Sequence, residues 1–108
     1  MIGHKFSFTA AFTITTLAVC AQLSVSNRGA LISLKEGAFL SIHGDYRSEQ
    51  NGSFDNEDTV FLFGDWINNA GNTGFNEPHE GAVVFLGDNQ HIRGTDVTHY
   101  YHLDHRGG

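Results

Sequence analysis

The chain has 108 residues, which is enough for one domain at most, and its formal net charge is −6. Its six basic residues form no patch interleaved with aromatic residues, and this argues against binding to nucleic acid. Its single cysteine, Cys20, excludes a fold held together by intrachain disulfides.

Residues 1–21 have the layout of a secretory signal peptide. A short basic region ends at Lys5, an apolar run rich in threonine follows, and small residues precede a predicted cleavage after Ala21. The run is too short for a confident membrane span, although a single-pass anchor is the alternative. A further alternative is a lipoprotein signal in which Cys20 is acylated, but the valine before it fits that motif poorly. We therefore expect residues 22–108 to be secreted or displayed on the outer cell surface, without a membrane span.

The rest of the chain predicts many short strands and no helix. Apolar residues recur in runs such as ALISLK, AFLSIH, TVFLF and AVVFLG, and glycine, asparagine or aspartate interrupts the chain every few residues. Three runs end in Gly-Asp, at Gly44, Gly64 and Gly87, with spacings of 20 and then 23 residues. Such spacings are typical of solenoids, in which extra residues are accommodated in a loop such as NTGFNEPHE.

Alignment of the three glycines produces two wholly apolar columns, at the second and fourth residues before each glycine. The columns consist of Ile42, Leu62 and Phe85, and of Leu40, Val60 and Val83. Apolar residues at every second position are expected on the inward face of a strand, and stacking the coils about 4.8 Å apart would bury them. We predict an all-β fold, a short β-solenoid of about three to four coils over residues 22–108, preceded by the signal peptide.

The Gly-Asp pairs are expected to mark the corners of the coils. Glycine permits the backbone geometry of a sharp corner, and aspartate or asparagine accepts hydrogen bonds from backbone amides there. Tyr46 and Trp66 follow the first two pairs at equivalent positions and are expected to stack, whereas Asn89 ends this column in the third unit. Asparagines at turn positions are expected to form amide ladders between coils. They are Asn51, Asn56, Asn68, Asn69 and Asn72.

The segment from Gly81 to Leu103 reads GAVVFLGDNQHIRGT and continues to YYHL. It resembles the N-terminal β-solenoid repeats of secreted, adhesin-like surface proteins of Bacteroidetes, of the gliding-motility-associated type, except that His102 stands where that pattern has asparagine. The residues that carry the resemblance are Gln90, Ile92, Gly94, Tyr100, Tyr101 and Leu103. The resemblance implies a surface role. Because no end cap is recognised after YYHLDHRGG, we expect a fragment whose partner is the continuation of its own solenoid or a downstream domain.

Two groups of side chains are candidate metal ligands. Asp45, Asp65 and Asp88 follow the three glycines and would form a column able to hold calcium between coils, unless each only caps its own turn. The second group is rich in histidine, a zinc ligand, but alternation along a strand points His102 away from its neighbours, which favours solvent-exposed side chains. Its members are His91, His99, His102, His105, Asp96 and Asp104. No other cofactor is expected.

Three functions follow from these features. The favoured one is a non-catalytic structural or adhesion segment of a secreted or cell-surface protein. The second is a carbohydrate-binding module that stacks the sugar rings of surface glycans on Tyr46, Trp66, Tyr100 and Tyr101, and burial of Trp66 would count against it. The third is the N-terminal coils of a β-helix enzyme that degrades polysaccharide. Few coils offer little concavity and no catalytic motif is present, so no catalytic residue is predicted.

Overall fold

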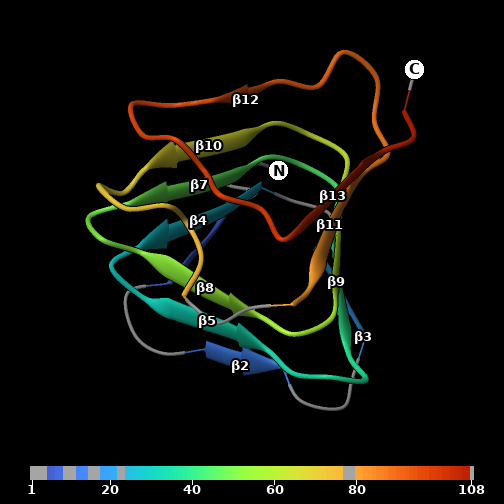
Figure 1. Cartoon of the computed structure of the whole chain (residues 1–108), viewed down its shortest axis with the longest axis horizontal. Helices are drawn as coiled ribbons and strands as arrows, with labels where there is room; N and C mark the ends of the chain where they lie inside the picture. The colour runs from blue at the N-terminus through green and yellow to red at the C-terminus, as the bar shows by residue number, and fades with distance from the viewer. Residues whose placement is uncertain (1–4, 9–11, 15–17, 22–23, 77–79, 108) are drawn as a thin grey trace.

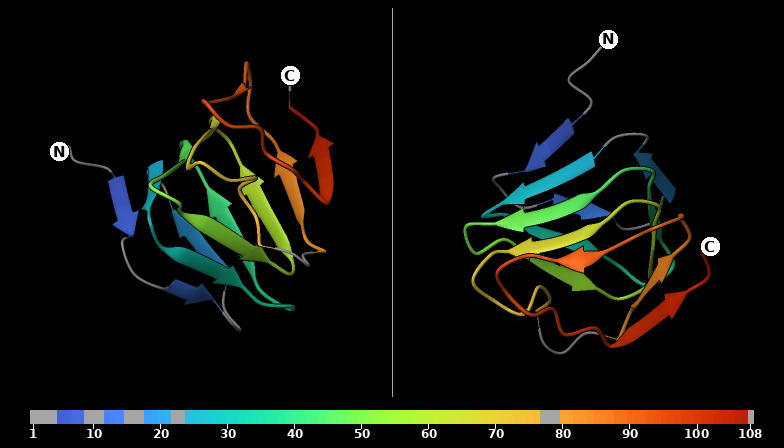
Figure 2. Two further views of the ribbon diagram at one scale, coloured as in Figure 1. Left: turned by 60° about the vertical axis from the view of Figure 1, so that its left-hand side comes forward. Right: turned by 90° about the horizontal axis from the view of Figure 1, so that it is seen from above.

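The computed structural model is a β-solenoid of about four turns, which confirms the predicted fold class (Figure 1). It describes residues 5–8, 12–14, 18–21, 24–76 and 80–107, and these contain no helix. The sheets form the walls of the stack, and a turn of the chain adds at most one strand to each wall. Strands that are neighbours in a wall therefore run parallel and come from successive turns. Figure 2 shows the successive turns one above the other from the N-terminal to the C-terminal end.

The strands form three parallel sheets, which we call sheets 1, 2 and 3. Sheet 1 contains β1 (Lys5–Phe8), β4 (Ser24–Arg28), β7 (Tyr46–Glu49), β10 (Trp66–Asn69) and β12 (Ile92–Arg93), in that spatial order. Sheet 2 contains β3 (Ala18–Ala21), β6 (Phe39–Ile42), β9 (Thr59–Leu62), β11 (Ala82–Phe85) and β13 (His102–His105). Sheet 3 contains β2 (Phe12–Ile14), β5 (Leu31–Leu34) and β8 (Ser53–Asn56).

The two predicted apolar columns are confirmed by the register of sheet 2. Val60 pairs with Leu40 on one side and with Val83 on the other, and the second column pairs in the same way two residues further along. All six side chains are buried, with at most 4% of their surface exposed. The period-two pattern of the sequence therefore specifies the core of this wall correctly.

The corner glycines have a different role from the one predicted. None of Gly44, Gly64 and Gly87 is among the described glycines with positive φ, so their corners do not need a left-handed backbone. A Cβ at Gly64 would instead collide with the backbone of Gly44 and the carboxylate of Asp45, and a Cβ at Gly87 would collide with the carbonyl of Phe63. Glycine is required here because consecutive rungs approach too closely at the corner for any side chain.

Sheet 3 ends earlier than the other two walls. After β8 its place is taken by a loop in which Phe75 forms an isolated bridge with Phe54. This loop lies in the longer third repeat, where extra residues were expected. In the last turn, residues 94–101, which we call the cap segment, cross the end of the core between β12 and β13.

The N-terminal strands belong to the stack in the full-length chain. Strands β1, β2 and β3 pair in parallel with β4, β5 and β6, one in each sheet. Signal-peptide cleavage after Ala21, acylation of Cys20 and the division into residues 1–21 and 22–108 stay predictions, because pairing in the uncut chain does not bear on processing. Within the described part of the chain, no helix is long and apolar enough to cross a membrane.

Candidate functional site

Asp45 and Asp65 lie one above the other at the corner that precedes sheet 1. Oδ1 of Asp45 accepts a hydrogen bond of 2.8 Å from the amide of Asp65, and Oδ1 of Asp65 accepts one of 2.9 Å from the amide of His91. One turn below, Oγ of Ser24 accepts the amide of Asp45 at 3.1 Å. Each side chain therefore binds the backbone of the next coil rather than its own turn, and together they form a ladder along this corner.

Asp88 is not a member of this ladder, so the predicted column of three carboxylates is wrong in its third position. Trp66 pairs with Ile92, which places His91 rather than Asp88 above Asp65. The sequence alignment failed because additional residues separate Gly87 from the strand that follows it. Among the described residues no three His, Cys, Asp or Glu side chains are grouped to hold a metal ion, so the calcium hypothesis has no geometric support.

Asp65 is the most strongly paired carboxylate of the ladder. Its Oδ2 accepts a hydrogen bond of 3.2 Å from Nε of Arg93, and Nδ1 of His91 lies 3.5 Å from its Oδ1. Burial raises the pKa of Asp65, but the amide of His91 and the guanidinium of Arg93 outweigh this effect, so the pKa lies below its ordinary value. Asp65 is therefore a charged structural anchor and not a proton donor near neutral pH.

Tyr46 and Trp66 are wholly buried and stack on each other with their ring centroids 4.4 Å apart, which confirms the predicted stacking. The hydroxyl of Tyr46 accepts a hydrogen bond of 3.1 Å from Nδ2 of Asn27, and burial raises its pKa to about 12. Nε1 of Trp66 donates to Oγ1 of Thr98 at 3.0 Å. Neither ring is available to stack on a sugar, and this counts against the carbohydrate-binding hypothesis as the sequence posed it.

The side chains of Tyr100 and Tyr101 point in different directions, the first towards the core and the second towards solvent. The ring of Tyr100 lies on the core, with its centroid 5.5 Å from that of Trp66 and 5.7 Å from that of Phe75, and burial raises its pKa. Tyr101 is 55% exposed and packs edge-on against His102 at 4.6 Å. Of the four predicted sugar platforms, only Tyr101 is classed as exposed, so the four rings form no common binding surface.

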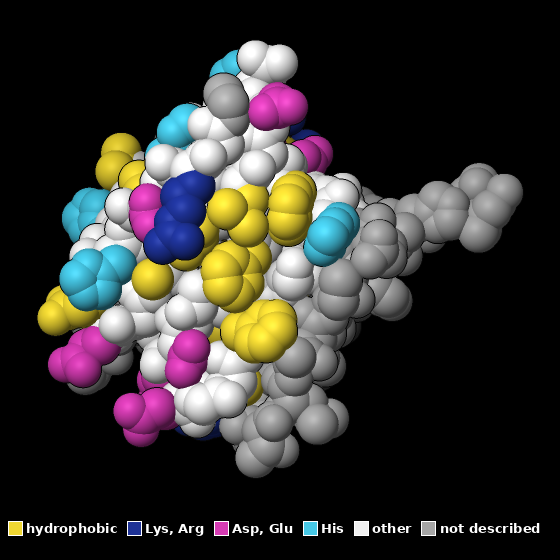
Figure 3. All heavy atoms as spheres, turned by 90° about the vertical axis from the view of Figure 1, so that its right-hand side faces the viewer, with side chains coloured by type: hydrophobic (Ala, Val, Ile, Leu, Met, Phe, Trp, Pro, Cys, Tyr) yellow, Lys and Arg dark blue, Asp and Glu magenta, His cyan; other side chains and the backbone are white. Residues whose placement is uncertain are grey.

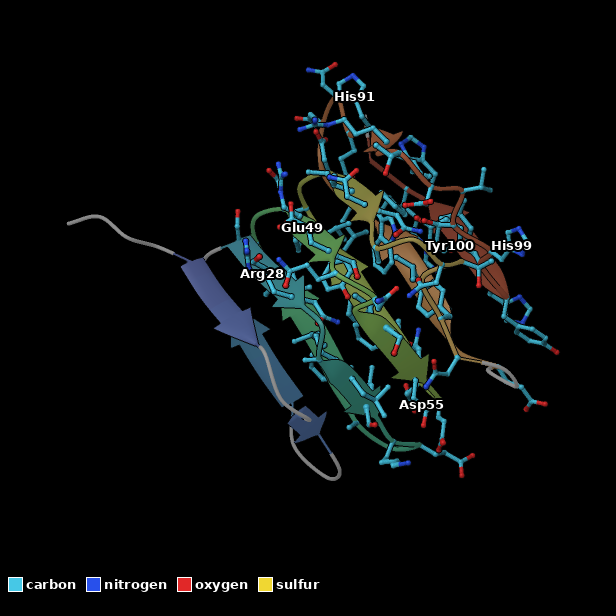
Figure 4. The ribbon with its side chains drawn as sticks, turned by 90° about the vertical axis from the view of Figure 1, so that its left-hand side faces the viewer. Arg28, Glu49, Asp55, His91, His99 and Tyr100 are labelled. Carbon is cyan, nitrogen blue, oxygen red and sulfur yellow. The ribbon has the colours of Figure 1, made fainter. Side chains whose placement is uncertain are left out.

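The four C-terminal histidines are exposed but are not brought together. His91 follows the corner before β12, whereas His99 lies in the cap segment, and Figure 4 shows the two at separate places in the last turn. His102 and His105 stand at opposite ends of β13. The interpretation of these histidines as solvent-exposed side chains is supported by this placement, and no zinc site is formed in the described residues.

Of the five asparagines predicted at turns, only Asn51 and Asn72 lie between strands, whereas the other three are the last residues of β8 and the last two of β10. The side chains of Asn56, Asn68, Asn69 and Asn72 bind backbone groups rather than one another. Oδ1 of Asn68 accepts the amide of Ala70 at 3.0 Å while its Nδ2 donates to the carbonyl of Asn72 at 2.8 Å. The register places Ser48 between Asn27 and Asn68 in this column. A ladder of identical amides is therefore interrupted, and each corner is held by its own set of bonds.

Sequence reasoning missed the cap segment, which covers the core at the last turn. The amide of Asp96 donates to the carbonyl of Asn68 at 3.0 Å, and Oδ2 of Asp96 accepts the amide of Gly71 at 2.8 Å. The amide of His99 donates to the carbonyl of Thr73 at 2.9 Å. No periodic pattern marks these residues, so the only sequence signal was the glycine at position 94, which has φ +125°.

The outer side of sheet 2 carries aromatic side chains, exposed or half-buried, that the sequence pattern did not single out as a group. The rings of Phe39 and Phe61 meet edge to face with centroids 5.7 Å apart, and His43 stacks on Phe63 at 4.3 Å. Figure 3 shows hydrophobic side chains gathered over this wall. Phe39 is 41% exposed, so part of this aromatic strip is accessible to solvent.

No protein-family model matches the chain, and neither a curated protein nor a solved structure is significantly similar to it.

Proposed function

We propose that the chain is a non-catalytic structural or adhesion segment of a secreted or cell-surface protein. The observation that carries this proposal is that the side chains best suited to chemistry are used inside the stack. Asp45 and Asp65 each accept a backbone amide of the next coil, and Tyr46 and Trp66 fill the core. Such residues stabilise the stack of coils, and a stack of repeated coils is suited to a stalk or an adhesion scaffold.

The enzyme alternative finds less support. A small open depression is lined by Ser24, Val25, Ser26, Asp45 and Arg47. It contains one carboxylate, whereas hydrolysis of a glycosidic bond ordinarily requires two that face each other across the substrate. That carboxylate already accepts the amide of Asp65 at 2.8 Å, so the depression supplies no free acid–base pair.

The secreted or surface location belongs to the same proposal. Two sequence features support it: the signal-peptide layout of residues 1–21 and the resemblance of residues 81–103 to repeats of Bacteroidetes surface proteins. Expression with an intact N-terminus, followed by N-terminal sequencing of the exported product, tests the location. A product that begins at residue 22 is expected, and a chain retained in the cytoplasm with Met1 intact would contradict this part of the proposal.

The non-catalytic role is tested with the purified chain on neutral and acidic polysaccharides. Release of reducing ends or of unsaturated products is measured for the unaltered chain, Asp45→Asn and Asp65→Asn. No turnover by any of the three is expected. In a separate flow assay on a surface coated with a glycan or a protein, beads coated with the folded chain should be retained more than beads coated with an unfolded control. Turnover that disappears in Asp45→Asn, with unfolding unchanged, would overturn the proposal.

A further inference from the structure

The last turn of the solenoid exposes apolar side chains, and two of them occupy positions that are buried in the turn below. The described residues contain five exposed large hydrophobic side chains, and four of them lie in this turn. These four are Ile92, Val97, Tyr101 and Leu103, with 50%, 74%, 55% and 48% of their surface exposed. We call the surface that they share with the free edges of β12 and β13 the end face.

Two of these side chains are the next members of core columns. Ile92 pairs with Trp66, which is completely buried one turn below. Leu103 pairs with Val83, which is 1% exposed. A coil laid on the end face would place its own inward side chains on Ile92 and Leu103. In the same way, each coil of the stack covers the inward side chains of the coil beneath it. The contact would therefore continue an interface that already repeats through the stack.

The backbone of the last turn is open in the same direction. β12 is the outermost strand of sheet 1 and β13 the outermost strand of sheet 2, so each has one edge that pairs with no strand among the described residues. At the opposite end of the stack, the outermost strands of the same two sheets are β1 and β3. Because all the strands are parallel, the N-terminal edge of one copy has the direction and the sheet positions needed to pair with the end face of another (Figure 2).

From this match we infer that copies of the chain associate head to tail, with the first coil of one copy on the end face of the next. β1 of the incoming copy would pair with β12, and β3 with β13. If residues 1–21 are removed, β4 and β6 become the first strands of the same two sheets, so the geometry is preserved. This inference deepens the proposed structural role, because a head-to-tail contact is not closed by symmetry and extends a rod.

The size of the end face predicts a weak contact. The Cα positions extend over 30 × 28 × 27 Å, and a triangular cross-section of that width has an area of roughly 400 Å², about half of the ~800 Å² per partner in stable complexes. The net charge of −6 adds repulsion between copies. Near the end face, Arg93 already pairs with Asp65 and Arg106 with Asp104. Association should therefore need high protein concentration and should strengthen with salt.

Sedimentation velocity of the full chain over a wide concentration range, at low and moderate salt, tests the inference. A series of species that lengthens with concentration is expected. Leu103→Lys and Ile92→Lys place a charge in the contact and should each weaken association by about tenfold or more. The matched control is Phe39→Lys, which alters the remaining exposed large hydrophobic side chain, on the outer wall of sheet 2, and should leave association unchanged.

Circular dichroism and urea unfolding of dilute samples establish that each variant is folded, so that loss of association is not loss of structure. A chain that stays monomeric at every concentration would overturn the inference, as would association that Phe39→Lys abolishes and the end-face variants do not. Growth that stops at a dimer would indicate a two-fold pairing of two end faces and would overturn the head-to-tail arrangement. These outcomes are independent of polysaccharide turnover, on which the proposed function is tested.

Discussion

Two leucines in different turns provide a direct test of the stacked columns. Leu62 is completely buried between Ile42 below and Phe85 above, whereas Leu103 lies in the last turn and is 48% exposed. The substitutions Leu62→Ala and Leu103→Ala remove the same atoms. They differ only in whether a further coil covers the site, so the comparison isolates the contribution of stacking.

The expected losses of unfolding free energy follow from burial. Leu62→Ala loses the transfer free energy and leaves a cavity closed on both sides, which together cost about 3 kcal/mol. At Leu103 solvent fills the space and only about half of the side chain is buried, so the loss should be about 1 kcal/mol. With a slope of about 1.5 kcal/mol per M in urea, the midpoints should fall by about 2 M and about 0.7 M.

Urea unfolding at low protein concentration, followed by fluorescence, measures both losses. The chain contains a single tryptophan, Trp66, which is completely buried and therefore reports on the core. Equal losses of unfolding free energy for the two variants, or a larger loss for Leu103→Ala, would show that Leu103 is not the last, partly exposed member of its column. In that case the assignment of coils would be wrong.

Further predictions concern the corner ladder, the cap segment and the core hydroxyl. Asp65→Ala should lower the free energy of unfolding by about 1 kcal/mol, because the amide of His91 loses its acceptor, whereas Asp65→Asn keeps an acceptor oxygen and should lose less in urea unfolding. The pKa of Asp65 is lower in the folded chain than in the unfolded chain, so its charge contributes stability at pH values above the unfolded pKa of about 4. This contribution is lost as the pH falls through the lower folded pKa. In acid unfolding, Asp65→Ala and Asp65→Asn should therefore lose less stability between neutral and acidic pH than the unaltered chain does. Gly94→Ala should lower the thermal midpoint more than Gly37→Ala does. Both glycines have positive φ, +125° and +94°, but a methyl group at Gly94 would collide with backbone atoms, whereas one at Gly37 would meet no atom within 4 Å. Burial raises the pKa of Tyr46 to about 12, so its neutral form contributes stability below pH 10 that is lost as the pH rises towards 12, and unfolding there should coincide with phenolate absorbance.

Each of these predictions has an outcome that contradicts it. If Asp65→Asn were as destabilising as Asp65→Ala, the charge rather than the hydrogen bond to the next coil would be responsible. Equal effects at Gly94 and Gly37 would show that the cap segment does not rest on the core. Ionisation of Tyr46 near pH 10 in a chain that remains folded would show that its hydroxyl is accessible to solvent.

The fold class and the inward columns could be predicted because they depend on a local property of the chain. Alternation of apolar and polar residues assigns each side chain of a strand to one face, whatever the strand packs against. Val60 and Leu62 were therefore placed correctly from the letters alone, and so was the stacking of Tyr46 on Trp66. The corner glycines were located correctly, although the reason given for them was wrong.

The candidate site could be predicted only in part, because membership of a column depends on the length of the intervening chain. Asp65 was assigned correctly above Asp45, but the residues added after Gly87 move His91 into the position predicted for Asp88. Proximity to a repeated glycine was the only guide available. Such a guide fails wherever one turn is longer than the last.

Periodicity in the amino-acid sequence thus establishes strands, their inward faces and the stacking of coils. Exposure of Trp66 was left open, because its burial depends on Thr98 and Tyr100, more than thirty residues further along the chain. The same applies to Ile92 and Leu103, which have the pattern of core residues and yet reach solvent. Alternation determines which way a side chain points, whereas only the three-dimensional arrangement of distant segments determines what, if anything, covers it.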